Sequence, residues 1–135
     1  MGRSRRPAQP DEKEAAMKAV FDTNILIDYL SGVESARTEI ARYTDRAVSI
    51  VTWMETLVGA RDAEEEDVIE MFLRDFELVP ITRAIGRDAV ALRKARRLRL
   101  PDALIWASAR SENALLVTRN TKDFPADDPG VRVPY

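Results

Sequence analysis

Short apolar runs alternate with amphipathic segments along the chain. The runs at residues 19–22, 47–51, 77–81, 114–118 and 131–133 have the length of buried strands. The segments between them carry apolar residues at helical spacing and predict helices at residues 25–30, 34–43, 52–57, 64–72, 82–99 and 101–109. Strands separated by helices form a parallel sheet that is covered on both faces. The pattern therefore predicts an α/β fold, a three-layer α/β/α sandwich with a mainly parallel sheet.

Several residues mark where these helices begin or end. Thr23 or Asn24 is expected to cap the first helix, and Gly32 to end it. Thr82 is expected to cap the long helix after the third strand, and Pro101 suits the first position of the last helix. This last helix is apolar nearly all round, so we expect it to be buried.

The segment at residues 2–16 differs from the rest of the chain, because it is polar and shows no apolar periodicity. We expect residues 1–16 to be a disordered extension and residues 17–135 to form one domain, since 135 residues suit a single core. No run approaches the roughly 20 apolar residues that cross a bilayer, and residues 1–17 lack the apolar core of a signal peptide. We therefore expect a cytoplasmic protein with no membrane partner.

The composition removes most of the common catalytic side chains. The chain contains no Cys and no His, so it can form no disulfide, no thiolate nucleophile and no Ser-His-Asp triad. Ordinary zinc and copper sites are also excluded, because they depend on sulfur or imidazole ligands. Any catalytic metal must be a hard cation such as Mg²⁺ or Mn²⁺, held by carboxylates, carbonyls and water.

Charge is distributed unevenly along the chain. The 21 basic and 23 acidic residues give a net charge of −2, yet residues 83–99 hold seven basic side chains and one acid, whereas residues 62–70 hold six acids. The predicted helix at residues 82–99 has a basic face opposite its apolar side, formed by Arg83, Arg87, Lys94 and Arg97. Such a face is either a solvated helix surface or a binding site for phosphate groups.

Four acidic residues lie where a parallel sheet presents the carboxyl ends of its strands. Asp22 ends the first strand, Glu55 lies one turn into the helix after the second, and Asp102 opens the last helix. Asp123 follows the strand at residues 114–118. Ligand sites in open α/β sheets lie at this edge, so these side chains can converge. Several carboxylates at one point repel one another unless a divalent cation neutralises them, which predicts a hard-metal site.

Each of these acids also has a purely structural interpretation. Asp22 can cap the helix that follows it, and Glu55 completes a capping box with Thr52, which is expected to open the helix at residues 52–57. Asp102 lies in a first turn, where the helix macrodipole favours an anion. The neighbours of Asp102 are so apolar that an ionised carboxylate there needs a partner.

The polar residues beside these acids are equally open to two interpretations. Asn24 and Thr118 are either caps and strand-end hydrogen-bonding groups or parts of the site. Asn120 stays near the carboxyl end of its strand, where its carbonyl oxygen can ligand a metal or a metal-bound water. Asp123 can fold back towards the same point, or it can brace the loop.

Four motifs follow one another along the chain. They are Phe21-Asp22-Thr23-Asn24 with its continuation to residue 30, residues 49–59 around Glu55, Leu100-Pro101-Asp102-Ala103 with its continuation to residue 107, and residues 116–124 around Thr118-Arg119-Asn120. Together they resemble the PIN-domain ribonucleases, and within them the VapC-like toxins of bacterial and archaeal toxin–antitoxin pairs.

The resemblance implies a small α/β sandwich, cleavage of single-stranded RNA that depends on Mg²⁺ or Mn²⁺, and a homodimer neutralised by a cognate antitoxin. By position, Asp22, Glu55 and Asp102 are the metal-site acids, and Thr118 orients a carboxylate. Asn120 stands where many relatives have Asp, and Asp123 is then the nearest carboxylate. The fourth ligand and the number of bound metals stay open.

The sequence thus predicts a metal-dependent ribonuclease that acts as the toxin of a toxin–antitoxin pair. The alternatives are a non-cleaving RNA- or protein-binding module with the same fold, and a magnesium-dependent phosphatase with Asp22 as nucleophile. The phosphatase needs a second Asp where this chain has Asn24. The predicted site comprises Asp22, Glu55, Asp102 and Asp123 as catalytic and metal-binding acids, Asn24, Thr118 and Asn120 in support, and Arg87 and Lys94 as RNA-binding residues.

Overall fold

The computed structural model describes residues 17–135, and the predicted disordered segment at residues 1–16 lies outside the described residues. Within the described part of the chain, five parallel strands form one sheet in the order β3-β2-β1-β4-β5. In the centre, Val20 of β1 is aligned with Ala47 of β2 on one side and Leu116 of β4 on the other. The strands are β1 (Ala19–Phe21), β2 (Arg46–Ser49), β3 (Glu77–Val79), β4 (Leu115–Val117) and β5 (Val131–Arg132).

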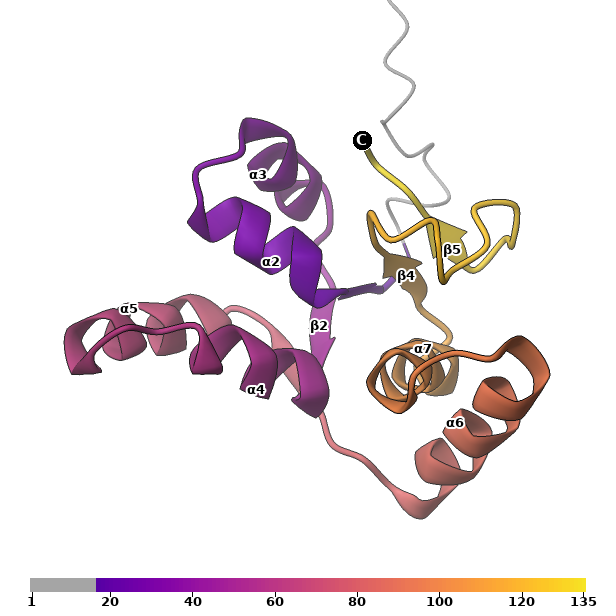
Figure 1. Cartoon of the computed structure of the whole chain (residues 1–135). Coiled ribbons are helices and arrows are strands. Elements are labelled where there is room, and N and C mark those ends of the chain that lie inside the picture. The colour runs from indigo at the N-terminus through magenta and orange to yellow at the C-terminus, as the bar shows by residue number, and fades with distance from the viewer. Residues whose placement is uncertain (1–16) are drawn as a thin grey trace, which may run out of the picture.

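Helices cover both faces of this sheet (Figure 1). The face with Phe21 and Val117 packs against α2, α3 and α5, and the face with Val20 and Leu116 packs against α6 and α7. Neighbouring strand residues point to opposite faces, so each short strand serves both layers. The helices are α2 (Thr23–Leu30), α3 (Glu34–Ala41), α4 (Ile50–Val58), α5 (Ala63–Leu73), α6 (Arg83–Arg96) and α7 (Leu100–Ser111). The predicted three-layer α/β/α sandwich is confirmed.

Aromatic side chains fill the layer between the sheet and the helices α2, α3 and α5. Phe21 of β1 meets Tyr43 and Phe76 edge-on, with ring centroids 5.8 Å apart in both pairs. Tyr29 of α2 stacks on Phe72 of α5 at 4.5 Å. Full burial of an aromatic side chain stabilises a fold by about 1.5–3 kcal/mol. This packing fixes α2, and with it the polar residues at its start, against the end of β1.

The helix predicted to be buried, α7, is buried between the sheet and α6. Ala103, Ile105 and Trp106 of α7 belong to the apolar core on this side of the sheet. Trp106 meets Phe124 edge-on at 5.7 Å, and the guanidinium of Arg96 lies 5.1 Å from the centre of the Trp106 ring. No helix within residues 17–135 is long and apolar enough to span a membrane.

The predicted boundaries of α2 and α6 differ from the structure. Neither Thr23 nor Asn24 caps α2, because the chain turns one residue earlier and Asp22 is the N-cap residue. The helix predicted at residues 82–99 ends at Arg96, since Arg97 adopts a left-handed conformation with φ of 56°. This turn ends α6 and lets the chain reverse into α7.

Candidate active site

A pocket of about 360 Å³ opens at the carboxyl ends of β1 and β4. The starts of α2 and α7, one turn of α4 and the segment after β4 contribute its lining. The predicted acids Asp22, Glu55 and Asp102 line this pocket, and Asp123 is not among its lining residues. The other lining residues are Thr23, Asn24, Ile27, Asp28, Arg99, Arg119 and Asn120.

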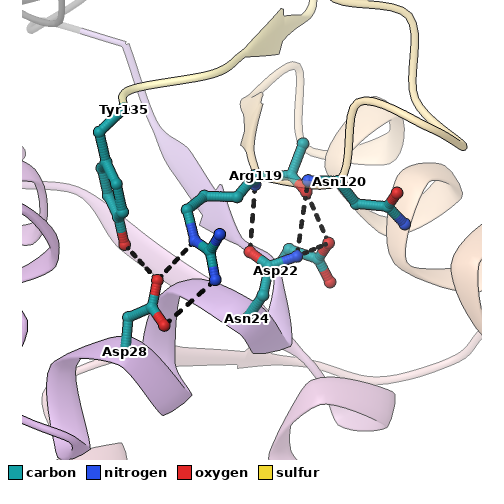
Figure 2. A network of polar contacts seen from close by, with 7 residues as sticks. Asp22, Asn24, Asp28, Arg119, Asn120 and Tyr135 are labelled. Atoms are coloured by element: carbon teal, nitrogen blue, oxygen red, sulfur yellow. Dashed lines mark hydrogen bonds and ion pairs between the residues drawn. The ribbon is translucent and has the colours of Figure 1, made fainter.

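Asp22 is held through both of its carboxylate oxygens, and Figure 2 shows the hydrogen bonds to one of them, Oδ2. Oδ1 accepts a hydrogen bond from the Thr23 backbone N–H at 2.8 Å, which caps α2. Oδ2 accepts hydrogen bonds from the Thr118 hydroxyl at 2.7 Å and from the Asn24 side-chain amide at 3.0 Å. The cap interpretation and the site interpretation therefore both apply to Asp22, because one oxygen caps the helix while the side chain lines the pocket.

The direction of the Thr118 hydroxyl follows from its neighbours. Thr118 is fully buried at the end of β4, and its Oγ1 accepts a hydrogen bond from the Asn120 backbone N–H at 2.9 Å. The amide nitrogen of Asn24 lies 3.4 Å from the same oxygen. With two N–H groups directed at it, the hydroxyl directs its own proton to Asp22. The predicted supporting residues thus contact Asp22 directly or through Thr118.

The environment of Asp22 disfavours its negative charge. Burial is the main cause that raises the pKa of its carboxyl group above the usual value. The hydrogen bonds from Thr118 and Thr23 act in the opposite direction, and the nearby charges of Asp102 and Glu55 raise the pKa further. A cation bound in the pocket would stabilise the negative charge of Asp22.

Asp102 lies in the first turn of α7, with 11% of its side chain exposed. Its Oδ2 is buried and accepts no hydrogen bond within residues 17–135, although Nε of Arg99 lies 3.6 Å away. Burial raises the pKa of Asp102; the charge of Arg99 opposes this, and the charges of Asp123 and Glu55 add to it. A buried acceptor without a donor costs about 1–3 kcal/mol, so a cation here would be stabilising.

Glu55 is exposed on α4 and bonds to the start of α2. Its Oε1 accepts a hydrogen bond from the Thr23 hydroxyl at 2.6 Å. The predicted capping box of Thr52 and Glu55 is wrong, because α4 begins at Ile50 and its N-cap residue is Ser49. Oγ of Ser49 accepts the hydrogen bond from the Thr52 N–H at 3.1 Å. The carboxylate of Glu55 therefore has no capping role in α4.

Asn120 and Asp123 bond to each other across the turn after β4. The Asn120 side-chain amide donates to Oδ2 of Asp123 at 2.9 Å, and the Asp123 backbone N–H donates to Oδ1 of Asn120 at 3.2 Å. Asn120 lines the pocket, whereas Asp123 acts on the site through its charge, which raises the pKa of Asp102. Asp123 thus braces the loop in this structure, and its role as a ligand stays a prediction.

The donor atoms at the pocket have the chemistry that a hard cation requires. Within the described range of the chain, no three His, Cys, Asp or Glu side chains are gathered closely enough to hold a metal ion. Glu55 and Asp123 each bond to a neighbouring side chain instead. However, the donors are all oxygen atoms, and the buried Oδ2 of Asp102 lacks a hydrogen-bond donor within residues 17–135. This set fits Mg²⁺ or Mn²⁺.

The two residues predicted to bind RNA, Arg87 and Lys94, are exposed on α6 and are not among the lining residues of the pocket. Arg96 is the last residue of α6, at the end that leads into α7. At a rise of about 1.5 Å per residue, Lys94 lies about 3 Å and Arg87 about 13 Å from Arg96 along the axis of α6. The basic residues that line the pocket are Arg99 and Arg119.

Sequence reasoning missed three charged residues of the pocket: Arg99, which precedes α7, and the pair Asp28 and Arg119. The positions of Asp28 and Arg119 carried a usable signal, because Asp28 is four residues after Asn24 on the same helix and Arg119 follows Thr118 directly. Residues four apart share one face of a helix, so Asp28 could have been assigned to the face that carries Asn24.

A family model for the PIN domain matches residues 19–126. The chain belongs to the PIN domain family. The resemblance carried by the four motifs is thus confirmed. Ribonuclease VapC1 of Methanocaldococcus jannaschii is 29% identical to this PIN domain over 118 residues, which cover 84% of this chain and 82% of that protein.

Solved structures share the fold. A chain in a toxin–antitoxin complex from Klebsiella pneumoniae is 44% identical, with a TM-score of 0.81, and the match covers 87% of this chain and 98% of that chain. A chain of VapBC2 from Rickettsia felis, bound to a promoter DNA fragment, is 23% identical, with a TM-score of 0.72 and coverage of 85% and 96%. The first likeness extends to the sequence, and the second shows the fold.

Proposed function

We propose that this PIN domain is the toxin of a toxin–antitoxin pair and hydrolyses phosphodiester bonds of single-stranded RNA. The observation that carries the proposal is the meeting of two buried carboxylates, Asp22 and Asp102, in one pocket. Glu55 adds a third carboxylate to the lining. Two similarities support the same function: one relative is a ribonuclease, and a chain that is 44% identical belongs to a toxin–antitoxin complex.

The reaction is proposed to depend on Mg²⁺ or Mn²⁺ held by Asp22, Glu55 and Asp102, with Asp123 as a further candidate. When bound, such a cation lowers the pKa of a coordinated water and stabilises negative charge on the reacting phosphate. The support for this assignment is the oxygen-only donor set and the buried Oδ2 of Asp102, which accepts no hydrogen bond within residues 17–135.

The chain itself prepares the pocket for this chemistry. Thr118 and Asn24 hold Asp22 in one orientation through hydrogen bonds of 2.7 and 3.0 Å. The N-terminal ends of α2 and α7 both border the pocket, and their macrodipoles favour a phosphate there. Within residues 17–135, the pocket is lined by carboxylates and by no His, Lys or Tyr, so water and carboxylates are the groups proposed to transfer protons.

The proposed partners are an RNA substrate and a cognate antitoxin protein, and we also expect a homodimer. Exposed apolar side chains on α4 and α5 support a protein partner, because such patches commonly mark contact surfaces. They include Met54, Val58, Val68 and Met71. We propose the cytoplasm as the site of action, since RNA substrates are present there.

Cleavage of a short fluorescein-labelled RNA of random sequence tests the proposal. We expect cleavage with Mg²⁺ or Mn²⁺, none with a chelator, and a loss of more than about a hundredfold in Asp22→Asn, since even outer partners of metal sites can matter that much. Circular dichroism checks that the variant is folded. RNA binding without cleavage would favour the non-cleaving module, and release of phosphate from a phosphomonoester would favour the phosphatase.

A further inference from the structure

A second polar cluster borders the pocket, and its side chains bond to one another and not to Asp22, Glu55 or Asp102. It consists of Asp28, Arg119 and Tyr135, which Figure 2 shows beside Asp22 and Asn24. Nε and Nη2 of Arg119 donate to the two carboxylate oxygens of Asp28, at 2.5 and 3.2 Å. The Tyr135 hydroxyl donates to Asp28 at 2.8 Å, and the Arg119 guanidinium carbon lies 5.7 Å from the centre of the Tyr135 ring.

Arg119 is fastened to α2 at two places. Its backbone N–H donates to Oδ1 of Asn24 at 3.1 Å, and its guanidinium bonds to Asp28, one turn further along the helix. Asp28 has 17% of its side chain exposed, whereas Arg119 has 42%. The carboxylate is therefore largely covered, and the cation stays accessible to a ligand.

The guanidinium retains donors for such a ligand. Arg119 uses Nε and one N–H of Nη2 on Asp28, so the remaining N–H groups of its guanidinium lie outside this ion pair. In Figure 2 the guanidinium lies between Asp28 on one side and Asn24 and Asp22 on the other. A planar guanidinium that is already oriented by a carboxylate loses little freedom when it binds a phosphate.

We propose that Arg119 binds a backbone phosphate of the substrate at the rim of the acidic pocket, and that Asp28 and Tyr135 are positioning residues for its guanidinium. This inference rests on the proposed function, because it assumes that RNA enters the pocket. The acids of the pocket repel a phosphate, so an oriented cation beside them offsets this repulsion.

The variants Arg119→Gln and Asp28→Asn separate phosphate binding from a purely structural role. Both break the ion pair between α2 and the segment after β4, but only Arg119→Gln removes the cation. We measure kcat and KM for the fluorescein-labelled random RNA over a series of salt concentrations. RNA binding by anisotropy is measured in parallel, with Asp102→Asn introduced to stop cleavage.

For Arg119→Gln we expect KM to rise about tenfold with a smaller change in kcat, because a phosphate contact binds substrate and transition state alike. The salt slope of binding should fall by about 0.7, the value for one phosphate on a single strand. Arg119→Lys should recover part of the affinity and the salt slope. Asp28→Asn should keep the salt slope, and Tyr135→Phe should raise KM less than Arg119→Gln does.

The matched control is Arg61→Gln at the start of α5. Arg61 also pairs with a carboxylate, that of Glu65 at 2.7 Å, but it is not among the lining residues of the pocket. This variant removes the same charge from the protein and should leave KM and the salt slope unchanged.

The outcomes distinguish this inference from the function on which it rests. If the wild type cleaves RNA while Arg119→Gln and Asp28→Asn have equal effects and neither changes the salt slope, Arg119 only connects the segment after β4 to α2. RNA binding that depends on Arg119 without any cleavage would support the phosphate contact and reject the nuclease. A protein that neither binds nor cleaves RNA would overturn both.

Discussion

Two regions of this PIN domain bury carboxylates, but only one of them pairs the negative charge with a buried cation. Between α3 and β5, Glu39 is 2% exposed and accepts hydrogen bonds from Arg132 at 2.7 and 3.1 Å and from the Tyr43 hydroxyl at 2.9 Å. In the pocket, Asp22 is bonded only by neutral groups, and Oδ2 of Asp102 has no hydrogen-bond donor within residues 17–135.

The difference separates a structural carboxylate from a functional one. Removing an ion from water costs several kcal/mol, and Arg132 offsets this cost for Glu39 inside the fold. At the pocket the described part of the chain supplies no comparable cation, so part of the cost remains until a ligand binds. Perturbed carboxylates of this kind in a cleft are typical of active sites, whereas a closed ion pair is typical of the scaffold.

The largest effect on stability is expected from Glu39→Gln. The substitution removes the negative partner of buried Arg132, and breaking a pair of this kind costs about 3–5 kcal/mol of unfolding free energy. Urea denaturation measures the loss, with Glu34→Gln on the exposed side of the same helix as the control that leaves stability nearly unchanged. A loss no larger than in the control would remove the contrast between the two regions.

Asp102→Asn should have the opposite effect on the metal-free protein. It removes a buried charge that the exposed Arg99, 3.6 Å away, compensates only in part, and it changes the shape little, so we expect stability in a chelator to rise by about 1 kcal/mol. The variant should also lose the stabilisation that Mg²⁺ gives the wild type, because a ligand stabilises only a fold that binds it. Calorimetric melting with chelator and with magnesium tests both points. An Asp102→Asn protein that Mg²⁺ stabilises as strongly as the wild type would remove Asp102 from the metal site.

Glu55→Gln and Ser49→Ala compare a functional residue with a structural residue on the same helix, α4. Ser49 caps α4, so Ser49→Ala should cost about 1 kcal/mol of stability and leave the activity of the folded protein intact. Glu55→Gln retains an acceptor for Thr23 but loses the charge, so cleavage should fall more than tenfold at an unchanged melting temperature. Full activity in Glu55→Gln would place Glu55 with the structural carboxylates.

The smallest effects are expected at the Asn120–Asp123 pair. Whether Asp123 is a structural or a functional carboxylate is open. Asp123→Asn should raise the Mg²⁺ concentration needed for half-maximal cleavage by a few-fold, and Asn120→Asp should lower it, because each changes the negative charge beside Asp102. Magnesium titrations of cleavage measure both shifts. If neither variant shifts the titration, the loop only braces the pocket.

Much of the fold was predictable because burial leaves a local pattern. A parallel sheet covered on both faces is indicated by the apolar strands around Val20 and Leu116 and by the apolar helix around Trp106. The order of the acids along the chain then places Asp22 and Asp102 at one edge of the sheet. The absence of Cys and His reduces the possible chemistry to oxygen ligands.

Other features of the site depend on hydrogen bonds and ion pairs between residues that lie far apart in the sequence. Local spacing suggested a capping box for Glu55, but the structure bonds it to Thr23, a residue of another helix. In the same way, α2 and β4 bring Asp28 and Arg119 together although 91 positions separate them along the chain. Hydrogen bonds and ion pairs act over a few ångströms and depend on side-chain orientation, so only the packed fold could assign these partners.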